Sequence, residues 1–308
     1  MNEKSLLDVV SRRITELAKK AAIEVPSDVA RALDDALVRE EAALENHDPL
    51  ASSAGRDVLR AIKENIDIAF SSRLPMCQDT GMFLVFCDVG RSMFLVSGDW
   101  EDAINDGLKK AIESVPYRRS VVSDPLFERT NTQNNLPAVF HWALSDGEGL
   151  RVSVLLKGFG SENCSGVRML RPTDGPKEVV SAVSDIMRTA GGKPCPPVFL
   201  GIGLGGTMDD AARMSKRALL RDYGTAHPDS RYAELESQVL ASVNRLGIGP
   251  GGLGGVGTAL SVAIEKGPTH IAGLPLAVSV NCWADRKFRI DVIHRPDGSW
   301  KVEEILYA

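Results

Sequence analysis

The chain has 308 residues, of which 44% are apolar and 25% charged, as in an ordinary globular protein that can bury its own core. The formal net charge of -5, without any block of Lys and Arg, argues against a general nucleic-acid surface, because phosphates must be met by clustered positive charge. No apolar run reaches the roughly 18 residues of a membrane helix, and no apolar signal core follows Met1, so we expect a soluble, cytoplasmic protein without a membrane partner.

The first 70 residues have the apolar spacing of helices. Leu6, Val10 and Ile14 recur at helical intervals, and Pro26-Ser27 ends this helix and caps the next. We therefore predict a mainly helical portion over residues 1–70.

Beyond this portion, short apolar runs bounded by glycine or proline alternate with helical patterns. The predicted helices are residues 50–68, 102–115, 175–190, 208–221 and 231–245. The predicted strands are residues 82–89, 138–143, 150–156, 198–200 and 274–280, with a hairpin across Pro296-Asp297-Gly298. The pattern predicts a mixed α/β (α+β) fold, in which sheets covered with helices follow the helical portion, as a single domain over residues 1–308.

The stretch at residues 75–81, PMCQDTG, places a thiol, an amide, a carboxylate and a hydroxyl in a row between two backbone breakers. Pro75 and Gly81 indicate a loop, and loops that carry many polar groups are common places for chemistry. We call this segment the 75–81 loop and expect it to form part of a functional site.

The chain has five cysteines: Cys77, Cys87, Cys164, Cys195 and Cys282. An odd number, widely spread in a chain that we expect in the cytosol, favours free thiols or metal ligands over disulfides. Three of them lie at predicted strand boundaries or beside prolines, but no CxxC pair distinguishes a metal site from unrelated buried thiols. Cys87 alternates with Phe83 and Val85 in a strand, so we predict a plain core position for it.

Two glycine-rich segments, residues 201–206 and 247–252, match GxGxxG. A dinucleotide fingerprint also needs an acidic residue at the end of the next strand, whereas Asp222 ends a predicted helix. We predict tight turns here, and leave open a backbone cradle for an anion. A nicotinamide-dependent oxidoreductase is the alternative that these glycines would support.

One histidine and one arginine have sequence contexts that suggest a functional role. His270 follows Pro268-Thr269 and precedes Cys282 by 12 residues, whereas the other four histidines have no metal-type spacing. Arg118, next to Arg119, is either half of a solvated pair or a bidentate ligand for a carboxylate.

Six motifs then give the chain a resemblance over nearly its full length. They are PMCQDTG at 75–81, YRRSVVSDP at 117–125, KGFGSEN at 157–163, PCPPVFLGIGLGGT at 194–207, LGIGPGGLGG at 246–255 and PTHIAGLP at 268–275. In this order they resemble the α subunit, or N-terminal catalytic region, of class I iron-sulfur fumarate hydratases and the related L(+)-tartrate dehydratases.

The resemblance implies a 4Fe-4S cluster with three Cys ligands, Cys77, Cys195 and Cys282, and one open iron. Such an iron can polarise a C-O bond as a Lewis acid, whereas electron-transfer clusters usually have every iron ligated. The implied activity is that of a hydro-lyase, which reversibly adds water to fumarate to give malate.

The resemblance also implies residue roles. Asp79 resembles the family's base, with Thr80 not separable from it, and His270 its substrate-binding histidine. Gln78, Arg118 and a backbone amide near Gly160 resemble further substrate contacts. Two departures from the family pattern are Gln133, in place of a glycine, and Cys164, in place of a methionine, and they imply a differently shaped pocket.

Finally, the resemblance implies partners and alternatives. We expect a β subunit that carries the missing C-terminal region, in an α2β2 assembly or on a homodimer of α. The segment around Cys282 and residues 224–236 are more similar to tartrate dehydratase, so L(+)-tartrate or another substituted dicarboxylate is the alternative substrate. An iron-sulfur sensing protein without turnover is the alternative of a different class.

Overall fold

The computed structural model describes residues 3–90, 93, 100–295 and 297–305. They divide into two compact units, the first formed by Met1–Pro26, Ile66–Lys157 and Arg286–Ala308, and the second by Ser27–Asn65 and Gly158–Asp285. None of the helices in the described ranges combines the length and the apolarity that a membrane crossing needs. The chain crosses from one unit to the other at four places, one of which lies within α3 (Ser53–Ser72).

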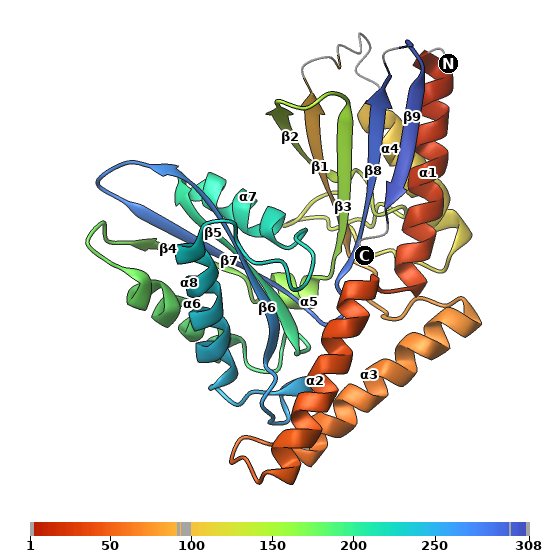
Figure 1. Cartoon of the computed structure of the whole chain (residues 1–308). Coiled ribbons are helices and arrows are strands. Elements are labelled where there is room, and N and C mark those ends of the chain that lie inside the picture. Colours follow the sequence, from red (N-terminus) through yellow and green to blue (C-terminus); the bar gives the residue numbers. More distant parts are fainter. Residues whose placement is uncertain (1–2, 91–92, 94–99, 296, 306–308) are drawn as a thin grey trace. The chain divides into compact units, whose positions relative to one another are not determined.

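The first unit is built on a five-stranded sheet with the order β2-β1-β3-β8-β9. Its strands are β1 (Met82–Gly90), β2 (Val139–Ser145), β3 (Leu150–Lys157), β8 (Arg286–His294) and β9 (Trp300–Ile305). Only β1 and β2 pair in parallel. The helices α1 (Glu3–Ile23) and α4 (Trp100–Ser114) pack on one face of this sheet (Figure 1).

Alternation of side chains produces the core of the first unit. Phe83, Val85 and Cys87 point from β1 into a fully buried cluster with the apolar faces of α1 and α4. The two helices approach closely because Gly107 has no side chain: a Cβ there would lie 2.5 Å from the carbonyl oxygen of Ser11. The core position predicted for Cys87 is therefore confirmed.

The second unit is built on a four-stranded sheet with the order β4-β7-β5-β6. Its strands are β4 (Gly166–Leu170), β5 (Val198–Gly206), β6 (Ala259–Thr269) and β7 (Leu274–Asn281). The helix α7 (Met208–Ala218) packs on one face, whereas α6 (Pro176–Ala190) and α8 (Ser230–Asn244) pack on the other, as Figure 1 shows. The unit also contains α2 (Ser27–Glu45), the short helix α5 (Phe159–Glu162) and a 3-10 turn, Pro250–Gly252.

The first glycine-rich segment is strand rather than turn. β5 continues through all of residues 201–206, where the sequence had led us to predict a tight turn after residue 200. A Cβ on Gly201 would lie 2.0 Å from the carbonyl oxygen of Ser215, and one on Gly203 would lie 2.0 Å from that of Ala211. These glycines let α7 lie directly against the strand, so close packing, not dinucleotide binding, accounts for them.

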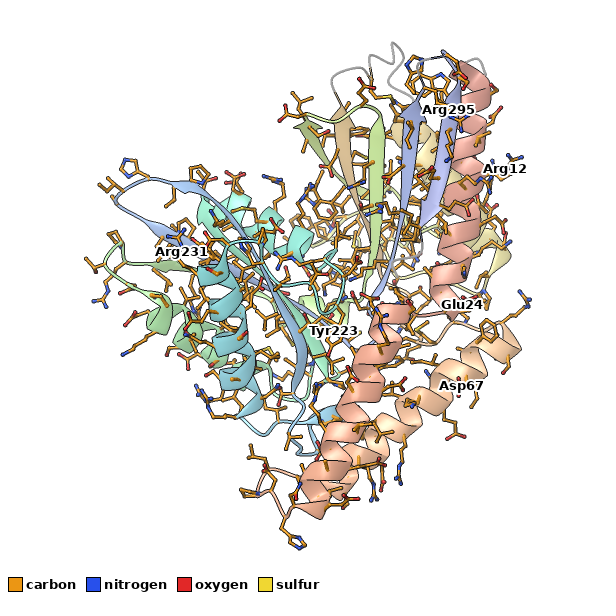
Figure 2. All side chains as sticks on the ribbon, in the orientation of Figure 1. Arg12, Glu24, Asp67, Tyr223, Arg231 and Arg295 are labelled. Carbon is orange, nitrogen blue, oxygen red and sulfur yellow. The ribbon has the colours of Figure 1, made fainter. Side chains whose placement is uncertain are left out.

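Buried carboxylates of α2 hold three other segments of the second unit. Asp28 accepts a hydrogen bond of 2.8 Å from the backbone N-H of Tyr223, which is labelled in Figure 2. Glu40, fully buried, accepts bonds from the backbone N-H groups of Ser52 at 2.7 Å and Val256 at 2.9 Å. Glu40 therefore holds the end of the loop that begins with the second glycine-rich segment, residues 247–252, against α2.

Replacing Glu40 by glutamine is expected to destabilise the chain by about 1–3 kcal/mol, because one of the two N-H groups that bond the buried carboxylate loses its acceptor. Urea unfolding of the two proteins measures this difference. Glu41→Gln is the matched control: Glu41 pairs with Arg60 on the surface, with side chains 38% and 54% exposed, so a loss of less than about 1 kcal/mol is expected. Equal losses for the two variants would contradict this role of Glu40.

The predicted fold class is confirmed, with helices at the N-terminus and helix-covered mixed sheets after them. The hairpin is also confirmed, because β8 and β9 pair antiparallel, although Pro296 lies outside the described residues.

Candidate functional site

The 75–81 loop is irregular, as predicted, and lies between α3 and β1 in the first unit. Cys77 and Asp79 are half-buried and Gln78 is exposed. One carboxylate oxygen of Asp79 accepts a bond of 3.0 Å from the N-H of Gly81, which holds its side chain within the loop.

Thr80 joins this loop to Arg118. The residue is 1% exposed, and its hydroxyl donates to the carbonyl oxygen of Arg118 at 3.3 Å. The Arg118 side chain is exposed and makes no ion pair with any described residue. The structure thus brings two of the predicted substrate contacts, Asp79 and Arg118, to one place, with a guanidinium available for an anion.

Arg286 also holds the 75–81 loop, and sequence reasoning missed it. This residue begins β8, is 1% exposed, and donates from Nη2 to the carbonyl oxygen of Asp79 at 2.8 Å. Within the described ranges its Nε and Nη1 have no hydrogen-bond partner. Burial raises the pKa of the neighbouring Tyr117 phenol, and the positive charge of Arg286 opposes that rise.

Two buried lysines lie at the same end of this sheet. Lys157 pairs with Met82 in the β1-β3 register, and Lys287 pairs with Leu155 in the β3-β8 register, next to Arg286. The two lysines are 1% and 2% exposed. The end of the first unit that carries the 75–81 loop therefore also carries two buried basic side chains beside Arg286.

Cys195 lies in the second unit, in a loop formed by close backbone contacts. The residue is exposed and has a left-handed φ of 55°, and its N-H donates to the carbonyl oxygen of Gly192 at 3.2 Å. On the other side, Gly192 packs so closely on Gly252 that a Cβ on the latter would lie 2.7 Å from the Cα of Gly192. The second glycine-rich segment therefore supports the loop that carries Cys195. This close packing explains why a glycine stands at position 252.

Cys282 lies directly after β7, at the same end of the sheet as Cys195. The register pairs Phe199 with Asn281, and Cys195 precedes β5 by three residues. Asn281 and Asp285, both fully buried, form a hydrogen bond of 2.5 Å across the turn that contains Cys282. The second unit therefore presents two of the three predicted thiols at one sheet end.

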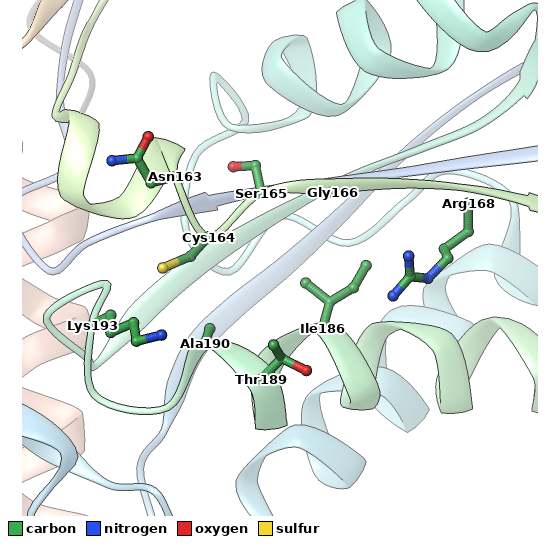
Figure 3. A pocket seen from close by; sticks show the side chains of 9 residues that line it. All are labelled: Asn163, Cys164, Ser165, Gly166, Arg168, Ile186, Thr189, Ala190 and Lys193. Atoms are coloured by element: carbon green, nitrogen blue, oxygen red, sulfur yellow. The ribbon is translucent and has the colours of Figure 1, made fainter.

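The helix α5 carries Gly160 beside the Cys195 loop. A Cβ on Gly160 would lie 4.0 Å from the carbonyl oxygen of Lys193, and Glu162 fixes the helix through an ion pair of 2.5 Å with Lys216. A pocket of about 230 Å³ adjoins these segments, and Figure 3 shows Cys164 and Lys193 at its left side. The Sγ of Cys164 lies 3.5 Å from the carbonyl oxygen of Gly160.

The structure separates His270 from these thiols. β6 ends at Thr269, which pairs with Gly206 at the far end of β5, so His270 lies in the turn between β6 and β7. The eight residues of β7 then separate this turn from Cys282, which amounts to roughly 23 Å at about 3.3 Å per step. His270 is exposed, and its Nδ1 accepts a bond of 3.1 Å from the N-H of Ala272.

The thiols differ in whether they can reach and bind a metal. Burial, with Asp88 second, raises the pKa of Cys87 far above its ordinary value, so that thiol stays protonated in the core. Cys77 and Cys282 are half-buried and Cys195 is exposed, so these three have access to an inorganic group. Among the residues described, no group of three or more His, Cys, Asp or Glu side chains is already arranged to hold a metal ion.

Comparisons with known proteins give a consistent result. The family model described as fumarate hydratase (Fumerase) matches residues 11–291. A Methanocaldococcus jannaschii protein, provisionally named L(+)-tartrate dehydratase subunit alpha, is 39% identical over 287 residues, which cover 90% of this chain and 95% of that protein. The L(+)-tartrate dehydratase subunits alpha of Escherichia coli K12 and Shigella sonnei are each 32% identical over 244 residues, or 78% of this chain and 80% of theirs.

Proposed function

Because the chain belongs to the fumarate hydratase family, we propose that it is the cluster-bearing subunit of a hydro-lyase that acts on a four-carbon dicarboxylate. The observation that carries this proposal is the hydrogen bond from Thr80 to the Arg118 carbonyl. It ties the Arg118 cation, which forms no ion pair with the described residues, to the loop that presents the Asp79 carboxylate. Hydration chemistry needs a base for the carbon-bound proton and a cation for the substrate carboxylate.

The donor set fits a 4Fe-4S cluster. Three thiols, Cys77, Cys195 and Cys282, lie on loops or directly after a strand, outside the cores, whereas Cys87 is withdrawn into one. We propose these three as the ligands. Three thiolates leave one iron of a cubane open, and when bound the cluster supplies a Lewis acid that polarises the C-O bond made or broken.

Side chains of this chain bind the substrate and transfer the proton. Arg118 binds a substrate carboxylate, with Gln78 and a backbone group near Gly160 as further contacts. Asp79 takes the proton from the carbon next to a carboxylate as the C-O bond breaks, and returns it when water adds to the double bond. Thr80 is buried with its hydroxyl directed at the Arg118 carbonyl, which supports a positioning role and leaves Asp79 as the proposed base.

The primary substrate that we propose is fumarate, in reversible exchange with malate. The names of the three relatives support L(+)-tartrate as a second candidate, with the same loss of water from a hydroxy dicarboxylate. Because those relatives are named as alpha subunits, we also propose a β subunit that completes the site.

Anaerobic reconstitution with iron and sulfide, together with the proposed β subunit, tests the proposal. Initial rates with fumarate and with L-tartrate are compared at equal enzyme concentration, and the higher kcat/KM identifies the substrate. A loaded complex that turns over neither compound would overturn the proposal and favour a sensing protein.

His270 serves, in this proposal, the active site of a second copy of the chain. The turn that carries it lies at the other end of the sheet from Cys195 and Cys282, so its own unit cannot bring it to them. A symmetric assembly of two α chains can place the turn of one copy at the site of the other.

Complementation between variants tests this role of His270. Cys195→Ala and His270→Ala chains are each expected to lose most activity alone. Co-expressed at equal levels, they should recover roughly a quarter of wild-type activity, because half of the dimers are mixed and each mixed dimer has one intact site. If the mixture recovers nothing, or if His270→Ala is fully active alone, His270 has no such role.

A further inference from the structure

Asn135 is a polar side chain that three hydrogen bonds hold beside Arg118. It is fully buried and has a left-handed φ of 55°, a conformation that asparagine tolerates better than most residues. Its Oδ1 accepts bonds from the N-H groups of Ser120 at 2.7 Å and Val121 at 3.2 Å, and its Nδ2 donates to the carbonyl oxygen of Arg118 at 2.8 Å. All three of these hydrogen bonds join the amide to the segment that starts with Arg118.

We propose that Asn135 is a positioning residue for Arg118 and thereby sets the affinity for the substrate carboxylate. This inference rests on the proposed function, in which Arg118 binds that carboxylate. The Arg118 carbonyl accepts from Asn135 on one side and from Thr80 on the other. Asn135 therefore fixes the backbone of Arg118, from which the guanidinium extends, relative to the 75–81 loop, which carries the proposed base.

The direction of the Arg118 side chain depends on this backbone support, because no other described residue bonds its guanidinium. It is exposed and forms no ion pair with the described residues, so the direction in which it leaves the backbone decides where it meets a carboxylate. A displacement of about 1 Å in a positioning group can lower a rate or an affinity about 100-fold. Asn131 provides a contrast. Its Nδ2 donates a hydrogen bond of 2.8 Å to the next carbonyl oxygen, that of Arg119, and the residue is only half-buried.

The variant of choice is Asn135→Gly, since glycine keeps the left-handed backbone and removes all three hydrogen bonds. In the reconstituted complex, we expect the KM for the dicarboxylate to rise about 10- to 100-fold, with kcat within about threefold and the cluster absorption unchanged. Asn131→Ala is the matched control, with KM within about threefold of wild type.

A double-mutant cycle separates positioning from general loosening. If Asn135 acts through Arg118, adding Asn135→Gly to Arg118→Ala changes KM less than threefold. If Asn135→Gly raises KM equally in the wild-type and Arg118→Ala backgrounds, or in neither, the inference is overturned. The proposed function is tested separately, by turnover of the wild-type complex. Should the glycine variant fold poorly, Asn135→Asp replaces it: the carboxylate keeps both accepted bonds, opposes the Arg118 carbonyl, and must raise KM in the same way.

Discussion

Replacing Cys195 by alanine is expected to remove the iron-sulfur absorption and the hydro-lyase activity together. Two thiolates cannot hold a cubane that needs three, and Cys195 is exposed in a loop formed by close glycine contacts, so no described core residue loses packing. Anaerobic reconstitution followed by visible absorption, iron analysis and turnover measures both losses. Activity should fall at least about 1,000-fold, because the proposed Lewis acid and the substrate's main anchor are lost with the cluster.

Cys87→Ala is the matched control for this experiment. Cys87 is buried among the apolar side chains of the first unit and its raised pKa keeps it protonated. Its replacement should cost about 1 kcal/mol of stability through the small cavity it leaves, while the iron content and the turnover stay at wild-type values. A Cys195→Ala protein that keeps a full complement of iron would rule out Cys195 as a ligand.

Replacing Asp79 by asparagine is expected to lower kcat about 100- to 10,000-fold, the usual contribution of a general base. The amide cannot take a proton at neutral pH, but its oxygen can still accept the Gly81 N-H that Asp79 accepts at 3.0 Å. The loop should therefore keep its shape, and both KM and the cluster absorption should stay within a few-fold of wild type. Stopped turnover with an intact spectrum separates this effect from loss of the cluster.

Exchange of the substrate's carbon-bound proton gives an independent measure of the same step. Wild-type enzyme should incorporate solvent deuterium into the hydroxy acid, and Asp79→Asn should do so at the reduced rate of turnover. If the variant retains more than a tenth of wild-type kcat, another group is the base and the role given to Asp79 is wrong.

Local patterns in the sequence predicted much of this structure. Apolar spacing predicted α1 and α2, and Phe-Val alternation predicted β1 with Cys87 inside it, because both depend on residues only a few positions apart. Pro75 and Gly81 likewise predicted the 75–81 loop, since backbone breakers act locally. The glycines of β5 misled the prediction because their function is to admit α7, a contact that no local rule anticipates.

The supports of the candidate site could not be predicted, since they join distant parts of the chain. Arg286 reaches the Asp79 carbonyl across 207 positions, and Asn135 reaches that of Arg118 across 17. In the sequence both are ordinary polar residues, one after Cys282 and one in a polar loop. Only the β3-β8 register and the burial of Arg286 distinguish it from a surface charge.

The division of the candidate residues between two units was equally invisible in the sequence. Cys77, Asp79 and Arg118 belong to the first unit, whereas Gly160, Cys195 and Cys282 belong to the second. The separation of His270 from the thiols follows from strand register, which short motifs do not encode. The resemblance grouped these residues by role, and the structure adds which of them share a unit.

Thiol mapping of the loaded chain tests the central claim, that Cys77, Cys195 and Cys282 together hold one cluster. The anaerobically reconstituted protein and its iron-free form are each treated with an alkylating reagent, and the modified cysteines are identified by mass spectrometry. The account predicts that iron and sulfide protect these three thiols together while Cys164, half-buried beside the pocket, reacts equally in both forms. Rapid alkylation of any one of the three in a protein that retains its iron would contradict it.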